Sequence, residues 1–357
     1  MSSFPQLSAS FAPESVPIPA HAIKEKRILI TGAGGSIGSA LAHAVAAHDP
    51  AQILLLDASE QALFHIDREL AAPHAPILAS VCDAPVLEEV FEHHRPHIVF
   101  HAAAFKHVPL MELHPFAAIE NNAIGTFTLA QAAVHYRTDQ LILVSTDKAV
   151  DPASIMGASK RIAELTALSL QTPTTKIKAV RLGNVLGSQG SVVPLFLQQI
   201  AQGRPVTVTH PDATRYFISV DHAAALLLFA LCEEFPGAIL IPEMSSPIRI
   251  EDIAQALIRQ SGTASEIVYT GLRPGEKLHE QLLSSNESFL SEAKAPLHAI
   301  RSDTIPPHRA AEIIEQLQAA VEGRDLSRLI GVVTQLIPAY KPSETLLVQQ
   351  AVAEFRA

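Results

Sequence analysis

The feature that most constrains the fold is a glycine-rich turn between a short apolar strand and a helix. The strand is Arg27-Ile28-Leu29-Ile30, and the turn Thr31-Gly32-Ala33-Gly34-Gly35-Ser36-Ile37-Gly38 follows it directly. The next residues show the period of a helix with one apolar face, formed by Leu41, Ala42, Val45 and Ala46. A glycine-rich turn in this context predicts a doubly wound parallel α/β sheet that binds a dinucleotide.

The residues of this turn have separate predicted tasks. Gly32 permits the tight turn, Gly35 lets the backbone approach a pyrophosphate, and Gly38 lets the helix pack closely. The helix then begins with Ser36 and Ile37, whose backbone amides are expected to face the phosphates.

A second strand, Gln52-Ile53-Leu54-Leu55-Leu56, ends at Asp57. A carboxylate at this place accepts hydrogen bonds from both ribose hydroxyls of NAD and repels the 2′-phosphate of NADP. NAD is therefore the predicted cofactor and NADP is disfavoured. The alternative is that Asp57 caps the next helix.

Composition excludes several other classes of protein. The 357 residues are 48% hydrophobic, which is enough for a large core, and the net charge of −10 disfavours nucleic acid or an anionic membrane as the main partner. The two cysteines, Cys82 and Cys232, do not form a disulfide framework, so a cytoplasmic location is expected. Residues 1–26 are rich in Ser, Pro and Ala and predict a mobile arm; no segment predicts a signal peptide or a membrane span.

The candidate chemistry lies between Ser145 and Lys160. The apolar run Leu141 to Val144 predicts a buried parallel strand, which places Thr146, Asp147 and Lys148 at its carboxyl end. Ligands bind at that edge of open α/β sheets. After Pro152 the pattern becomes helical, and Met156 lies one helical turn before Lys160 on the same face.

A Ser/Thr at a strand end followed by Tyr-x-x-x-Lys on the next helix is typical of the extended short-chain dehydrogenases/reductases. Here Met156 stands at the Tyr position. With Thr146-Asp147-Lys148, the chain resembles one branch of that superfamily, the nucleotide-sugar 4,6-dehydratases that act on UDP-N-acetylglucosamine in bacterial polysaccharide and glycan synthesis. The resemblance runs from about Arg27 to Leu283. Some relatives carry amino-terminal transmembrane helices, and this chain resembles the soluble short form.

The resemblance implies a Rossmann-type doubly wound sheet with a smaller α/β substrate-binding lobe. The expected division has four parts. Residues 1–26 form a flexible arm, and residues 27–182 form an NAD-binding Rossmann domain to which 213–234 return. Residues 183–212 and 235–300 form the nucleotide-sugar-binding lobe, and residues 301–357 form a C-terminal helical segment. A homodimer or larger homo-oligomer is expected, paired through the helices near Gly125 to Tyr136 and Gly157 to Leu170.

The activity implied by the resemblance is a redox-neutral dehydration of a UDP-activated amino sugar. Sugar C4 is oxidised, C5 loses its proton, water leaves C6, and C6 is reduced. Our hypothesis is that Asp147 is the acid for the C6 hydroxyl and Lys148 the base at C5, so their surroundings must push their proton affinities in opposite directions. Burial would keep the carboxyl protonated, and a neighbouring positive charge such as Lys160 would keep the amine neutral. Lys160 would hold the nicotinamide ribose, and Thr146 would bond O4.

Met156 cannot accept a proton, so another group must take the O4 proton. Asp147, an ordered water and a ribose-linked relay remain open. A Met on an apolar helix position is also an ordinary core residue. In the branch that the chain resembles, Met accompanies retention of configuration at C5, which favours the retaining dehydratase over the C5-inverting one.

The cofactor half offers further contacts. The small residues Ala102 and Ala103 follow the strand 97–101 and leave room for the nicotinamide ribose. By resemblance, Asp83 contacts the adenine, although it is also a candidate helix cap. The resemblance also implies sugar contacts from Lys106 and His107, whose alternative is an ordinary exposed loop.

The resemblance assigns the remaining substrate residues. Asn122 has a structural or proton-relay role, and Asn184 meets the diphosphate. Arg215 binds phosphate or nucleoside, unless it pairs with a surface carboxylate. Arg273 and Glu276, in the motif Arg-Pro-Gly-Glu, lie by the diphosphate and nucleoside, where a guanidinium offers bidentate hydrogen bonds. No metal-binding residue is assigned.

Two other functions stay open. A nucleotide-sugar 4-epimerase shares the fold and the C4 oxidation, but it normally keeps the Tyr and needs no acid-base pair after the Ser/Thr. A non-catalytic NAD-binding sensor would explain Met156, but it has no need of Lys148, Asn184, Arg215 and Arg273 together.

Overall fold

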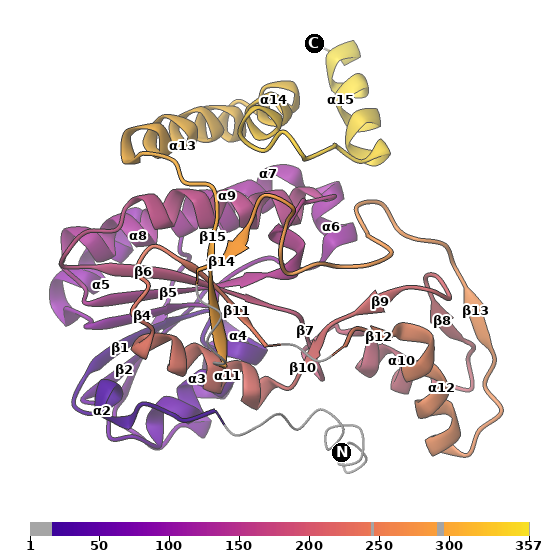
Figure 1. Ribbon diagram of the computed structural model, residues 1–357, viewed down its shortest axis with the longest axis horizontal. Helices are drawn as coiled ribbons and strands as arrows, with labels where there is room; N and C mark the ends of the chain where they lie inside the picture. The colour runs from indigo at the N-terminus through magenta and orange to yellow at the C-terminus, as the bar shows by residue number, and fades with distance from the viewer. Residues whose placement is uncertain (1–15, 244–245, 291–295, 357) are drawn as a thin grey trace.

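The computed structural model describes residues 16–243, 246–290 and 296–356, and it consists of a large sheet flanked by helices with a smaller lobe beside it (Figure 1). The sheet has nine strands in the order β14-β15-β11-β6-β5-β4-β1-β2-β3. The strands from β3 to β11 run parallel, and β15 and β14 add an antiparallel edge. This confirms the predicted doubly wound α/β fold.

The strands of the sheet form where apolar runs can be buried on both faces, as parallel sheets require. Leu141 to Leu143 of β5 are fully buried, and Ile28 of β1 lies between Ile53 and Ile98 in register. The strands are β1 (Arg27–Thr31), β2 (Gln52–Asp57), β3 (His74–Leu78), β4 (Ile98–His101), β5 (Gln140–Thr146), β6 (Lys176–Leu182), β11 (Ile239–Pro242), β14 (Ser288–Phe289) and β15 (Leu297–Arg301).

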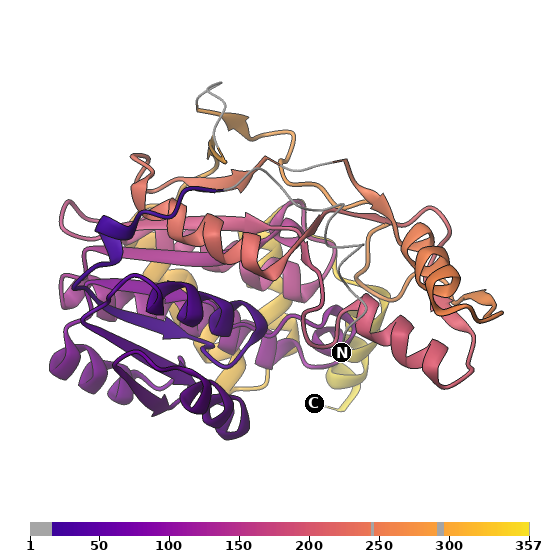
Figure 2. The same ribbon diagram turned by 90° about the horizontal axis from the view of Figure 1, so that it is seen from below.

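Helices cover both faces of the sheet, as Figures 1 and 2 show from two directions. One face is covered by α3 (Ser36–Ala46), α4 (Glu60–Glu69) and α11 (Val220–Phe229), which share an apolar core with β1 and β2. The other face is covered by α5 (Ala84–His94), α8 (Gly125–His135) and α9 (Ile155–Ser169). The carboxyl ends of β1, β4 and β5 consequently meet at one edge, where the candidate site lies.

The smaller lobe lies beside the sheet in both views and has its own apolar core, to which Phe196, Val206 and Leu257 contribute. The chain enters it at β7 (Asn184–Val185), which pairs with β10 (Phe217–Ile218). The rest of the lobe is built from α10 (Val192–Ala201), α12 (Ile250–Ser261) and the strand pairs β8 (Val206–Val208) with β13 (Ile267–Tyr269) and β9 (Thr214–Arg215) with β12 (Ile248–Arg249).

Two predicted boundaries differ from the structure. The segment 235–300 is expected in the smaller lobe, but its strands β11 and β15 belong to the large sheet, where Ile239 pairs with Ala179 of β6. The mobile arm is expected to reach residue 26, but α2 (Ala20–Ile23) is helical and Ile23 is fully buried in the sheet's core. Apolar burial decides both cases. Residues 1–15 of the arm lie outside the described residues.

The C-terminal segment forms α13 (Pro307–Glu322), α14 (Leu326–Leu336) and α15 (Glu344–Arg356). Ile314 and Leu317 of α13 share an apolar cluster with Ile155 and Ile162 of α9. Every residue of α9 from 155 to 167 is buried. The face of α9 that was expected to pair with a second subunit is therefore covered by the same chain, and the oligomeric state stays a prediction. In the ranges that the structure describes, no helix combines the length and apolarity needed to cross a membrane.

Candidate active site

The glycine-rich turn after β1 forms a close-fitting cradle. Gly32 has φ +65°, and a Cβ at this position would lie 2.7 Å from the amide nitrogen of Ala103. A Cβ on Gly38 would collide with the carbonyl of Gly32. Only glycine fits this geometry, in which the turn, the start of α3 and the loop after β4 converge. The arrangement fits a dinucleotide pyrophosphate held by backbone amides.

Asp57 at the end of β2 holds this turn in place. Its Oδ2 accepts a hydrogen bond from the amide of Gly34 at 2.9 Å, and its Oδ1 accepts one from the amide of Ser59 at 2.8 Å. Ser59 itself is the cap of α4, because its hydroxyl accepts from the amide of Ala62. The capping alternative for Asp57 is therefore wrong, and its contact with the ribose stays a prediction.

The capping interpretation of Asp83 is confirmed. Its Oδ1 accepts a hydrogen bond from the amide of Val86 at 3.3 Å, at the start of α5. This bond leaves the second carboxylate oxygen for another partner, so an adenine contact by Asp83 stays a prediction.

Asn122 ties the loop after β4 to the site helix. It lies in η1 (Glu120–Ile124), a π-helical turn, and its Oδ1 accepts from the amide of Phe105 at 2.8 Å. Its Nδ2 donates to the carbonyl of Phe105 and to Oγ of Ser159 on α9. The structural role predicted for Asn122 is confirmed, because these bonds fix the loop that carries Lys106 and His107.

A buried histidine lies beneath the site and was not predicted. His101 at the end of β4 contacts Oγ1 of Thr31 at 2.7 Å and Oγ1 of Thr126 at 2.8 Å. Burial, followed by the charge of Lys160, lowers the pKa of His101 to about 3, so the ring stays neutral. Burial also lowers the pKa of Lys160 to about 8, against the opposing charge of Glu164. This brings Lys160 within reach of deprotonation near neutral pH.

Met156 packs as a core residue. It is 3% exposed and belongs to one apolar cluster with Val108, Met111 and Ile314. A thioether in such surroundings contributes packing and neither accepts nor donates a proton. Met156 therefore cannot serve as an acid or a base at this site.

Asp147 and Lys148 lie together at the end of β5, in η2 (Asp147–Ala149). Oδ1 of Asp147 accepts from Nζ of Lys148 at 2.9 Å and from Oγ1 of Thr146 at 2.9 Å. The carboxyl is fully buried, and within the described ranges its Oδ2 has no hydrogen-bond partner. Gly157 lets α9 approach the turn η2 closely, since a Cβ at this position would collide with the carbonyl oxygen of Lys148. The unpartnered Oδ2 makes Asp147 a candidate acid.

The surroundings of Lys148 differ from the prediction. Its Nζ also donates to Oδ1 of Asn184 at 2.9 Å and lies 3.8 Å from Oε1 of Glu280. The charged groups that contact it are therefore carboxylates, where a positive neighbour such as Lys160 was expected. Asn184 orients the amine of Lys148 through its Oδ1, and its expected contact with a diphosphate stays a prediction. We call Asp147, Lys148, Asn184 and Glu280 the site cluster.

Glu280 was missed by sequence reasoning. It is 6% exposed, and burial followed by the charge of Asp147 raises its pKa, against Lys148, Arg215 and Lys277. Its signal in the sequence is its place at the end of the motif 271–280, four residues after Glu276 and before the apolar pair 282–283.

Arg215 has a role in positioning the chain. It is buried, and its guanidinium donates to the carbonyls of Thr214, Lys277 and Leu278 at 2.7 to 3.0 Å. The alternative of a pair with a surface carboxylate is wrong. These bonds fix the segment that carries Glu280, and a contact between Arg215 and phosphate stays a prediction.

The rim of the site is cationic. Arg273 is oriented by Glu276, with Nη2 to Oε1 at 2.5 Å, and its side chain is 56% exposed. Burial lowers the pKa of His107, and the charges of Lys106 and Arg273 lower it further. Lys106 donates to Oγ of Ser188 at 3.3 Å. Cationic groups from both parts of the molecule thus lie near one another, which suits a diphosphate.

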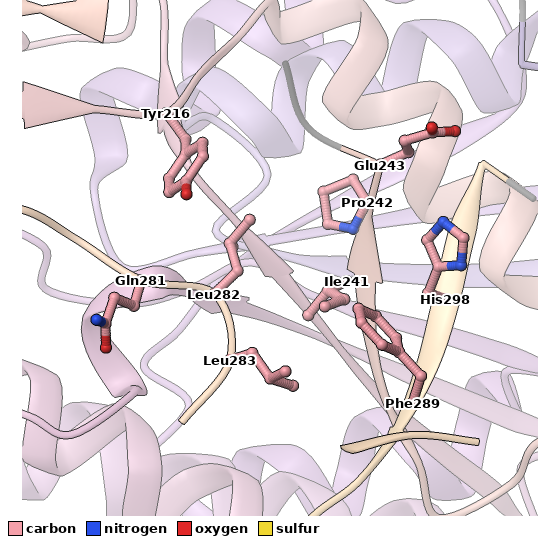
Figure 3. A pocket seen from close by; sticks show the side chains of 9 residues that line it. All are labelled: Tyr216, Ile241, Pro242, Glu243, Gln281, Leu282, Leu283, Phe289 and His298. Atoms are coloured by element: carbon pink, nitrogen blue, oxygen red, sulfur yellow. The ribbon is translucent and has the colours of Figure 1, made fainter. Parts of the chain in front are cut away.

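A separate cavity of about 420 Å³ lies at the carboxyl end of β11. Figure 3 shows Tyr216, Gln281 and Leu282 on one side of it and Phe289 and His298 on the other. None of the predicted site residues lines this cavity. It adjoins the segment that carries Glu280 but is distinct from the site cluster.

Comparison with known proteins places these features in context. A protein family described as "Polysaccharide biosynthesis protein" matches residues 28–301. The chain is 45% identical over 276 residues to the capsular polysaccharide biosynthesis protein CapD of Staphylococcus aureus, a match that covers 74% of this chain and 46% of CapD. The chain thus spans about half the length of that relative.

Two further similarities bear on fold and chemistry. The UDP-glucose 4-epimerase of Rickettsia massiliae is 34% identical, over 74% of this chain and 79% of that enzyme. The solved structure of Pen from Bacillus thuringiensis matches with a TM-score of 0.70 and 26% identity, and covers 83% of this chain and 99% of Pen. Other solved structures of the same fold contain NAD.

Proposed function

The chain belongs to the polysaccharide biosynthesis protein family, and we propose that it catalyses the NAD-dependent 4,6-dehydration of a UDP-N-acetylhexosamine. The product would be the UDP-4-keto-6-deoxy sugar, formed from UDP-N-acetylglucosamine with retention at C5. One observation carries the proposal: an acid and a base candidate, Asp147 and Lys148, are hydrogen-bonded at the sheet edge, and Oδ2 of Asp147 is buried without a partner.

The cofactor proposed is NAD, which would supply the hydride acceptor and donor for the sugar. The cradle of Gly32, Gly35 and Gly38 would hold its pyrophosphate, and Asp57 would accept the ribose hydroxyls. Lys160 would hold the nicotinamide ribose. Its lowered pKa of about 8 supports a role in which its proton can be exchanged.

The side chains divide the proton transfers between them. Oδ2 of Asp147 would protonate the C6 hydroxyl as water leaves, and Nζ of Lys148 would take the C5 proton and return it. The proton released from O4 when C4 is oxidised would reprotonate Asp147, directly or through an ordered water or a ribose-linked relay, so that the cycle balances. The amide of Asn184 and Oδ1 of Asp147 fix Nζ from two sides at 2.9 Å, so the base is held in one position. Arg273, with Lys106 and His107, would bind the diphosphate at the cationic rim.

A nucleotide-sugar 4-epimerase is the second candidate, favoured by the 34% identity to the Rickettsia enzyme. It would use the same cofactor cradle and the same C4 oxidation. Against it, an epimerase has no need of the acid-base pair Asp147 and Lys148 beside the strand end, and by resemblance it normally keeps the Tyr where this chain has Met156.

The test is to incubate the purified protein with UDP-N-acetylglucosamine, without added reductant, in ordinary and in heavy water. Mass spectrometry of the nucleotide sugar should show the loss of one water and the gain of a solvent deuterium at C5. An unchanged mass with a new stereoisomer would mean the epimerase. No change in the sugar, with NAD bound, would reject both reactions on this substrate.

A further inference from the structure

We propose that Glu280 is a positioning residue that holds the amine of Lys148 in the site cluster and does so only while its carboxyl is ionised. The role in turnover rests on the proposed function, whereas the pairing itself rests on geometry alone. The two residues come from different parts of the chain, Lys148 from the end of β5 and Glu280 from the segment that returns from the smaller lobe.

The place of Glu280 is fixed by several independent contacts. Arg215 of β9 donates to the carbonyls of Lys277 and Leu278 at 2.8 and 3.0 Å. One residue before Glu280, the ring of His279 contacts Oγ1 of Thr214 at 2.9 Å. The carboxylate of Glu280 is thus carried to Lys148 by a segment bonded to the lobe.

The carboxylate of Glu280 is the third oxygen-bearing group beside Nζ of Lys148. Oδ1 of Asp147 and Oδ1 of Asn184 lie at 2.9 Å, and Oε1 of Glu280 lies at 3.8 Å on the side of the returning segment. Oε2 of Glu280 is buried and has no hydrogen-bond partner in the ranges that the structure describes. A buried carboxylate oxygen without a partner is costly, which is typical of a group retained for function.

The charges that face Glu280 influence the pH at which its carboxyl becomes ionised. Lys148 and Asp147 face it from η2, Arg215 from β9 and Lys277 from its own segment, with Nζ of Lys277 3.9 Å from Oε2. Burial and the charge of Asp147 raise its pKa above the ordinary 4.5, and the three cations oppose this shift. Acidification would therefore neutralise Glu280 and release Lys148 from one of its three partners. No proton is gained or lost by Glu280 over a full cycle.

The first measurement needs no substrate. Glu280→Gln keeps the size of the side chain and removes the charge that pairs with Nζ of Lys148, so the amine is held less firmly and is more open to an electrophile. Acetylation of Lys148 by acetic anhydride at fixed pH, followed by peptide mass mapping, should be about fivefold faster than in the wild type. Glu266→Gln, which removes an exposed carboxylate from the same lobe, is the matched control and should leave the rate unchanged. An unchanged rate in Glu280→Gln would overturn the pairing.

The second measurement is the pH profile of turnover with UDP-N-acetylglucosamine. At alkaline pH, kcat of Glu280→Gln should be about tenfold below that of the wild type, because the base is less well placed. The ratio should shrink towards one as the pH falls and the wild-type carboxyl becomes protonated. Glu280→Asp should keep the pH dependence with a smaller defect. A purely structural role would give a ratio independent of pH, which would overturn the proposal.

The two measurements separate the possible failures. If the wild type converts no UDP-hexosamine, the proposed function fails while the acetylation rate still tests the pairing. If turnover is normal and acetylation is unaffected by Glu280→Gln, only the role of Glu280 fails. If thermal unfolding shows that Glu280→Gln does not fold, both measurements are made on Glu280→Asp. A wild-type acetylation rate together with a wild-type pH profile in Glu280→Asp would overturn the proposal.

Discussion

Two groups of buried charges lie in this molecule, and they differ in how completely they are paired. The first, which we call the paired cluster, consists of Arg161, Glu164, Arg181 and Glu287. Arg181 meets Glu287 at 2.7 Å and Glu164 at 2.9 Å, and Arg161 meets Glu164 at 2.9 Å. In the site cluster, by contrast, Asp147 and Glu280 each keep one buried oxygen that has no hydrogen-bond partner among the residues described.

The difference shows in the pKa shifts of two buried glutamates, Glu164 and Glu280. Burial alone would raise the pKa of Glu164, but Arg181, Arg161 and a hydrogen bond from Ser145 hold it at about 2. In Glu280 the same effect of burial prevails, and its pKa is raised. A fully paired cluster holds the fold, whereas an incompletely paired one leaves atoms available to a ligand.

The largest expected effect comes from breaking the paired cluster. Arg181→Leu would leave Glu164 and Glu287 buried without their main partner and should lower the free energy of unfolding by about 3–5 kcal/mol. Urea unfolding at neutral pH measures this. The control is Arg309→Ala, which removes the surface pair between Arg309 and Glu312 and should cost less than about 1 kcal/mol. Equal losses in the two variants would mean that the paired cluster does not hold the fold.

The same kind of change in the site cluster should affect activity and spare the fold. Asp147→Asn keeps the shape but removes the acid, so turnover of the sugar should fall by about 100- to 10,000-fold. The free energy of unfolding should change by less than about 1.5 kcal/mol, because the amide oxygen of Asn can keep the bonds from Lys148 and Thr146, and Oδ2 has no hydrogen-bond partner to lose. Activity assays, urea unfolding and the amount of retained NAD check this. Near-normal turnover would contradict the acid role.

A smaller expected effect is the dependence of the free energy of unfolding on pH, to which the paired cluster contributes. Because the pKa of Glu164 is held at about 2 in the folded chain, below its ordinary 4.5, its stabilisation is complete above pH 4.5 and is lost as the pH falls towards 2. The loss should be about 3 kcal/mol in the free energy of unfolding. Comparison of wild type and Arg181→Leu across this range measures it. A wild-type slope no steeper than that of the variant would contradict the assignment.

Local patterns made much of the fold predictable. The glycine-rich turn, the strand before Thr146 and the adjacent pair Asp147 and Lys148 are each encoded within a few residues, and the structure has β1, α3 and β5 where these patterns place them. Their spacing required no knowledge of distant segments.

Distant pairings were not predictable. Arg181 and Glu287 are 106 residues apart in the sequence, and nothing near either one indicates the other. The approach of Glu280 to Lys148 and the covering of α9 by α13 depend in the same way on where the chain returns after the smaller lobe. A buried charge must find a partner, but a single sequence does not say which one.

The segment that returns from the lobe supplies one carboxylate to each cluster, Glu280 to the site and Glu287 to the paired cluster. This limits how freely the molecule can be recombined. A chimera that exchanges the lobe with that of a relative, in order to change the proposed substrate specificity, would cut through both clusters if its junction fell within 277–287. Junctions placed outside this segment, with Glu280 and Glu287 kept beside their native partners, would make the lobe an exchangeable module.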